Sequence, residues 1–196
     1  MKQILIIHGG TSFSSYESYR QYLDEKEINF EKLIHPHRWK QDIADKISDA
    51  EVIYASMPNY LNAVYDEWVV YFEKILPYLK DDVQIIGHSL GAMFLAKYLD
   101  EKPLDNVVKR LILVSGGYND DSYEDLGSFE LISARNVSQS AKEIHLFHSK
   151  DDPVVPFAEL SKFQVDLPEA ICHVFKDRGH FLGPEFPELI TLLKQR

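Results

Sequence analysis

The fold is decided by the stretch "QIIGHSLGAMFLAKYL" (residues 84–99), in which an apolar run changes its period at Ser89. The residues before Ser89 have the continuous apolar character of a buried strand, and those after it have the spacing of a helix. A strand that passes directly into a helix is typical of α/β folds. The stretch therefore indicates a sheet whose strands alternate with helices.

Further short apolar runs resemble the strand part of this stretch. Most are near-continuous Val, Ile and Leu, as expected for parallel strands that helices cover on both faces. The six predicted strands are "QILIIH" (3–8), "EVIYAS" (51–56), "VQIIGH" (83–88), "RLILVS" (110–115), "EIHLFH" (143–148) and "AICHVF" (170–175). We expect an α/β fold with a mostly parallel, doubly wound sheet of about six strands flanked by helices.

The chain of 196 residues is expected to form a single domain, 1–196, with a helical insertion at about 14–48 after the first strand. We expect helices near 16–26 and 38–48 within this insertion.

Two segments are less regular. The piece "INFEKLIH" (28–35) is open between a strand and a helical turn. The stretch 116–133 is expected to be a solvated loop, with a small lid as the alternative.

The composition narrows the function classes. A net charge of −10 argues against a nucleic-acid surface or an anionic-membrane anchor, because both need basic patches. The single cysteine, Cys172, excludes an intrachain disulfide, and we expect it to be a buried structural thiol. The apolar run near the N-terminus is too short for a signal-peptide core, and no run approaches a membrane span. We expect a cytoplasmic protein of undetermined oligomeric state.

Residues 87–91 match the pattern G-x-S-x-G between a predicted strand and a predicted helix. This is the setting of a nucleophile elbow, in which a sharp turn strains the serine backbone and glycines remove colliding side chains. The alternative is a turn serine that caps the helix. The pattern predicts that the Ser89 hydroxyl is exposed at the carboxyl edge of the sheet.

A serine hydroxyl needs a base, and an acid must orient that base. The loop "SKDDPVVP" (149–156) follows one predicted strand, and "KDRGHF" (176–181) follows another. We favour Asp152 over Asp151 as the acid, because Pro153 biases its predecessor towards an extended backbone. His180 is the candidate base, with a simple turn histidine as the alternative.

An oxyanion hole needs two backbone N–H donors. We expect one from Leu90 and the other from the loop "HGGTSF" (8–13), with Gly10 first and Thr11 close behind. The alternative is a glycine turn that only leads into the next helix. No residues have metal-ligand or nucleotide-loop spacing, so we expect neither a metal nor another cofactor.

Four segments in this order and spacing carry a resemblance: "IIHGG", "GHSLGAMFLAKYL", "DDPVVP" and "DRGHF". They resemble the α/β-hydrolase superfamily and, with "MPN" at 57–59, most of all the small serine-hydrolase family that includes the retinoblastoma-binding serine hydrolase. The resemblance implies a triad of Ser89, Asp152 and His180. It also implies that Met57 and Asn59 line the pocket. We count Thr11, from the loop after the first strand, as a third candidate for substrate binding.

The same resemblance implies an esterase-like hydrolase that cleaves a small ester or amide through an acyl-enzyme. Two alternatives remain open. In the first alternative, the protein is a catalytically weak or inactive protein-interaction module. In the second, it is an enzyme that carries out acyl transfer or lyase chemistry on the same fold.

Overall fold

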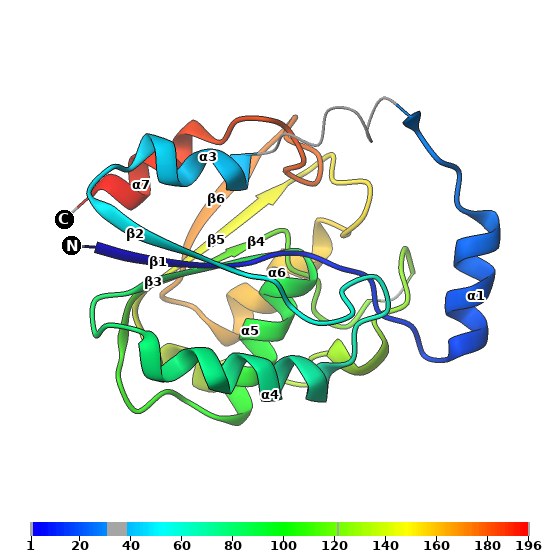
Figure 1. The fold of residues 1–196 in the computed structure, drawn as a ribbon, viewed down its shortest axis with the longest axis horizontal. Helices are drawn as coiled ribbons and strands as arrows, with labels where there is room; N and C mark the ends of the chain where they lie inside the picture. Colours follow the sequence, from blue (N-terminus) through cyan, green and yellow to red (C-terminus); the bar gives the residue numbers. More distant parts are fainter. Residues whose placement is uncertain (1, 31–38, 121, 196) are drawn as a thin grey trace.

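The sheet of this protein is parallel throughout, and its carboxyl edge is where the candidate residues gather (Figure 1). The computed structural model describes residues 2–30, 39–120 and 122–195. The strands are β1 (Lys2–Ile7), β2 (Ala50–Ala55), β3 (Gln84–His88), β4 (Val108–Val114), β5 (Ala141–Ser149) and β6 (Ile171–Phe175). Their order is β2-β1-β3-β4-β5-β6, and every neighbouring pair is parallel. The predicted fold class is confirmed.

Helices cover both faces of the sheet. On one face lie α4 (Tyr65–Ile75), α5 (Leu90–Glu101) and α6 (Ala158–Asp166), and on the other lie α3 (Trp39–Lys46) and α7 (Pro187–Lys194) (Figure 1). Successive strand residues therefore enter different cores: Leu5 and Ile7 face the first layer, and Ile4 and Ile6 face the second. Two buried faces explain why β1 is a continuous apolar run. The 3₁₀ turns are η1 (Leu76–Tyr78), η2 (Gly127–Phe129) and η3 (Arg135–Gln139).

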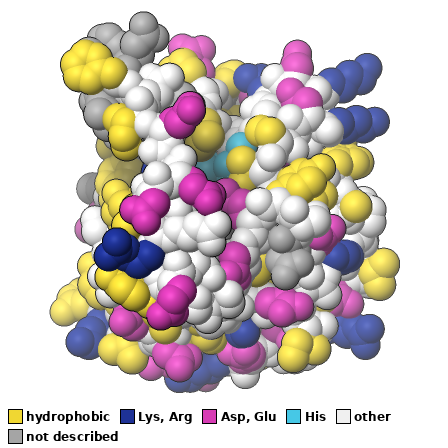
Figure 2. Space-filling model, turned by 90° about the vertical axis from the view of Figure 1, so that its right-hand side faces the viewer, with side chains coloured by type: hydrophobic (Ala, Val, Ile, Leu, Met, Phe, Trp, Pro, Cys, Tyr) yellow, Lys and Arg dark blue, Asp and Glu magenta, His cyan; other side chains and the backbone are white. Residues whose placement is uncertain are grey.

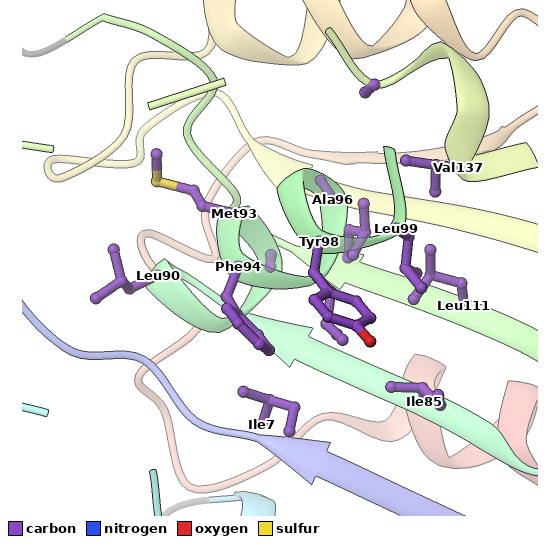
Figure 3. Close-up of a cluster of buried hydrophobic side chains, with 14 of the residues drawn as sticks. Ile7, Ile85, Leu90, Met93, Phe94, Ala96, Tyr98, Leu99, Leu111 and Val137 are labelled. Carbon is purple, nitrogen blue, oxygen red and sulfur yellow. The ribbon is translucent and has the colours of Figure 1, made fainter. Parts of the chain in front are cut away.

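Helix α5 is buried along most of its length, and side chains such as Phe94 and Tyr98 project from it into the core (Figure 3). Phe72 of α4 meets Phe94 and Tyr98 edge-on, with ring centroids 5.3 and 5.0 Å apart. At its first turn α5 approaches the end of β1 closely, since a Cβ on Gly91 would lie 2.6 Å from the carbonyl oxygens of Ile7 and His8. Glycine is required there, and the contact fixes the start of α5 beside β1.

The described part of the chain between β1 and β2 includes α1 (Tyr16–Glu25) and α3, and these helices have different surroundings. Helix α1 has no buried residue and stands beyond the ends of the strands (Figure 1). Helix α3 packs on the sheet through Trp39 and Ile43, which are buried. Most of the piece 28–35, which the sequence leaves open, lies outside the described residues.

The irregular stretch 116–133 is exposed in its middle, at 122–124, as expected of a solvated loop, but its two ends are held against the protein. Its backbone N–H groups at Tyr118, Asn119 and Asp120 all donate to Oε2 of Glu159 on α6, at 2.7, 2.9 and 3.1 Å. Phe129 is also buried. A fully buried carboxylate therefore anchors the part of this stretch that borders the candidate site.

Candidate active site

The candidate site lies where the strand order changes direction. The chain leaves β1 towards β2 on one side and returns to β3 on the other, so β1 and β3 border a topological switch point. Ligands in open parallel sheets bind at the carboxyl edge beside such a point. Figure 2 views this edge of the molecule, and histidine side chains are visible in a hollow near its centre.

Ser89 has the strained backbone that the elbow predicts. Its φ is 56° and its ψ is −124°, outside the conformations that a non-glycine residue prefers. Its N–H donates to the Val114 carbonyl at 2.8 Å, which ties the turn to β4. The hydroxyl makes no capping hydrogen bond to α5, so the capping alternative is wrong.

The loop after β1 passes directly over this serine. A Cβ on Gly9 would lie 2.9 Å from Cβ of Ser89 and 3.4 Å from its Oγ. Any side chain at Gly9 would therefore crowd the hydroxyl. The glycine lets the backbone of this loop approach the reacting position.

His180 and Asp152 form a buried pair. Nδ1 of His180 lies 2.9 Å from Oδ2 and 3.0 Å from Oδ1 of Asp152. The carboxylate also accepts the N–H groups of Val154 and Val155 at 2.9 and 3.0 Å. Burial raises the pKa of Asp152, but the hydrogen bonds from His180 and these two N–H groups outweigh it and leave the pKa below its usual value.

The geometry of this pair determines which nitrogen is basic. An ionised carboxylate only accepts hydrogen bonds, so Nδ1 of His180 carries the hydrogen. Nε2 then carries the lone pair. It is buried and has no hydrogen-bond partner among the described residues. His180 and Ser89 line the same recess.

Asp151 has a different role from its neighbour. Its Oδ1 accepts from the Ser149 hydroxyl at 2.5 Å and from the Gly179 N–H at 2.9 Å. Asp151 is exposed. Its hydrogen bond with Gly179 connects the loop after β5 to the loop after β6. In the part of the chain that the structure describes, Asp151 makes no hydrogen bond with the His180 ring.

Three backbone N–H groups are candidate donors to an oxyanion: those of Gly10, Thr11 and Leu90. The N–H of Thr11 is already engaged, because it donates to the Tyr60 carbonyl at 2.9 Å. Gly10 has no such partner among the described residues, which favours it over Thr11. Leu90 is the first residue of α5, where backbone N–H groups have no intrahelical acceptor and the helix dipole is positive.

His8 holds the β1 loop in this position. Its Nε2 accepts the Met57 N–H at 3.0 Å, so Nδ1 carries the hydrogen and donates to the Gly9 carbonyl at 2.6 Å. Burial lowers the pKa of His8, which favours this neutral form. The sequence analysis missed His8, although its place directly before Gly9 and Gly10 was a visible signal.

Two adjoining recesses meet at Ser89. Both are lined by Gly10, Thr11, Ser89, Glu124 and Val154. One continues along Met93, Leu126 and Pro156, and the other continues along Met57, Tyr60, Leu182 and His180.

The three candidate substrate-pocket residues, Thr11, Met57 and Asn59, divide into two groups. Thr11 and Met57 line these recesses. Asn59 lines neither, because it sits in a tight turn with φ of 48° and its amide donates to Glu67 at 2.8 Å.

Charged side chains that the sequence did not single out also line the site. Lys26 and Lys40 line the recess that contains His180, and Glu124 borders both recesses. Burial raises the pKa of Glu124, and the nearby His180 opposes that shift. Within the described ranges, no cluster of three or more His, Cys, Asp or Glu side chains could hold a metal ion. No helix among the described residues is long and apolar enough to cross a membrane.

The parallel sheet, with a strained serine between β3 and α5, is that of the α/β-hydrolase fold. The chain belongs to the serine hydrolase family, whose model matches residues 34–185. It is 29% identical over 160 residues to the serine hydrolase RBBP9 of Rattus norvegicus, covering 80% of this chain and 83% of the relative. It is 27% identical over 191 residues to the putative hydrolase YdeN of Bacillus subtilis, covering 94% and 88%.

A solved structure supports the same fold. The crystal structure of the ydeN gene product from B. subtilis superposes with a TM-score of 0.78 at 22% identity. The superposition covers 98% of this chain and 97% of that one. The two proteins therefore share their architecture along nearly their full length.

Proposed function

We propose that this protein cleaves a small ester or amide through an acyl-enzyme formed on Ser89. The observation that carries the proposal is the buried His180 ring: its Nδ1 donates to Asp152, its Nε2 has no hydrogen-bond partner among the described residues, and the residue lines the same recess as Ser89. A base held in this tautomer can accept the proton of a serine hydroxyl.

The steps follow from these positions. Oγ of Ser89 attacks the substrate carbonyl carbon while its proton moves to Nε2 of His180. The N–H groups of Leu90 and Gly10 stabilise the resulting oxyanion. His180 then gives the proton to the leaving oxygen or nitrogen as the bond to the acyl group breaks.

Hydrolysis of the acyl-enzyme repeats the sequence with water. His180 takes a proton from the attacking water, and Ser89 leaves with that proton after the second oxyanion collapses. Asp152 keeps Nδ1 protonated throughout and stabilises the imidazolium that forms twice. Because Ser89 lies where two recesses meet, the acyl group and the leaving group have separate places on its two sides.

The test is labelling by a fluorophosphonate, which reacts only with an activated serine. The wild-type protein should be labelled and should hydrolyse p-nitrophenyl acetate, and Ser89→Ala should do neither. Ser115→Ala is the matched control, because Ser115 also has a positive φ of 46° at the end of a strand but is completely buried. It should be labelled like the wild type.

Two results would overturn the proposal. One is a folded wild-type protein that neither labels nor turns over the ester, which would favour an interaction module. The other is a Ser89→Ala variant that keeps full turnover.

A further inference from the structure

We propose that Lys40 and His88 are positioning residues for His180, acting through a hydrogen-bond chain that ends on its backbone carbonyl. This inference rests on the proposed function, in which His180 is the base. It assigns part of the insertion to holding the catalytic machinery.

The chain has a defined direction. Nζ of Lys40 lies 2.9 Å from Nδ1 of His88, and Nε2 of His88 lies 2.8 Å from the carbonyl oxygen of His180. A lysine ammonium only donates, so Nδ1 of His88 accepts and Nε2 carries the hydrogen. That hydrogen meets a carbonyl oxygen, which only accepts, so donors and acceptors match at both contacts.

A second contact from the same helix holds the next residue. The indole Nε1 of Trp39 donates to the Phe181 carbonyl at 2.8 Å, in a buried position. Trp39 also meets the His88 ring edge-on, with centroids 6.0 Å apart. We call the loop 176–181, which carries His180, the base loop. Helix α3 therefore contacts two consecutive carbonyls of the base loop, that of Phe181 directly and that of His180 through His88.

The base loop needs such support. His180 lies between Gly179 and Phe181, and both have φ of 51°. A positive φ at a non-glycine residue such as Phe181 is strained and persists only where the surroundings hold it. The contacts from Trp39 and His88 are the surroundings that hold this turn on its backbone side.

These contacts affect catalysis through the position and orientation of Nε2 of His180. Asp152 fixes the His180 ring at Nδ1, and His88 fixes the backbone from which that ring projects. Without the His88 contact the carbonyl group of His180 itself is no longer held, and Nε2 can shift about the contact with Asp152. Such misplacement slows proton transfer without weakening substrate binding, so kcat should fall while KM stays constant.

The experiment compares Lys40→Met with Lys40→Arg. Lys40→Met keeps the aliphatic stem and removes the donor, so kcat for p-nitrophenyl acetate should fall about tenfold with KM within about twofold. Lys40→Arg restores a donor and should recover most of the lost kcat. Lys46→Met, at the exposed end of α3, is the matched control and should behave as the wild type.

His88→Phe is the second variant, because it keeps a ring and removes both contacts. It should lower kcat by at least as much as Lys40→Met, with its folding checked by thermal unfolding. If kcat of both Lys40→Met and folded His88→Phe equals that of the wild type while Ser89→Ala is inactive, this inference is wrong and the proposed function stands. If Ser89→Ala keeps its turnover, the proposed function itself fails.

Discussion

Helix α1 and the loops that carry Asp152 and His180 border the same hollow, but they are held by very different contacts. Asp152 accepts three hydrogen bonds in a buried position, and the base loop is held by Trp39 and His88 from its other side. By contrast, α1 has no buried residue.

Among the described residues, the hydrogen bonds that connect the start of α1 to the rest of the protein come from Ser14. The N–H and the hydroxyl of Ser14 both donate to Oδ2 of Asp125, each at 2.7 Å. The Phe13 ring packs against Tyr19 and Tyr22 within the same segment. The comparison teaches that regular secondary structure and firm anchoring are separate properties at this site. The irregular loops that carry Asp152 and His180 are held by several buried hydrogen bonds, whereas helix α1 lies at the surface beside them.

Substitution of the two neighbouring aspartates, Asp151 and Asp152, tests the firmly held loops and should give the largest effect. Asp152→Asn should lower kcat about 10⁴-fold, because an amide at this position favours the wrong tautomer of His180. Asp151→Asn should cost less than about tenfold, since Asp151 is hydrogen-bonded to the loop backbone and not to the His180 ring. Ester turnover at saturating substrate measures both, and the reverse ranking would show that Asp151 is the acid.

Substitution of Glu159 tests whether its hydrogen bonds hold the segment 118–120 as firmly as the loops of Asp152 and His180 are held. Glu159→Leu removes the acceptor of three N–H groups in a fully buried position, so it should lower the free energy of unfolding by about 3 kcal/mol. Urea unfolding measures the change. Glu169→Leu, at an exposed position, is the control and should differ by less than about 0.5 kcal/mol. Equal effects in the two variants would contradict the anchoring of this loop.

Ser14 tests the loosely held side and should give the smallest effect. Ser14→Ala removes the hydroxyl contact with Asp125 and leaves the backbone contact, so stability should change by less than about 0.5 kcal/mol. The amides of α1 should exchange with solvent faster than in the wild type, while those of α5 should not. A change in kcat larger than that of Asp151→Asn would show that α1 belongs to the catalytic machinery.

Much of the fold could be predicted because the central strands are buried on both faces. β1 and β3 have neighbours on both sides and helices on both faces, so their apolar runs are unmistakable. The edge strand β6 pairs only with β5 and is half-exposed, although its sequence reads like the others. For this reason Cys172, expected to be a buried thiol, is only partly buried.

The candidate site was predictable to the extent that its residues follow strand ends. Ser89, Asp152 and His180 each lie in a loop after a parallel strand, and topology brings such loops to one edge. Lys40 and Trp39 could not be found in this way. They lie on a helix within an insertion, and their contact with the base loop depends on where that helix packs on the sheet.

The closeness of the β1 loop to the start of α5 also bears on how this sequence can change. A methyl group at Gly9 would press on the Ser89 side chain, and one at Gly91 would press on the carbonyls of Ile7 and His8. The "HGG" and "GHSLG" segments lie about eighty residues apart, yet their backbones share one small volume. Neither segment can drift alone. In mutational libraries the two segments should behave as a single unit. A larger residue at Gly9 or Gly91 should be tolerated only together with a second substitution that makes room for it in the other segment.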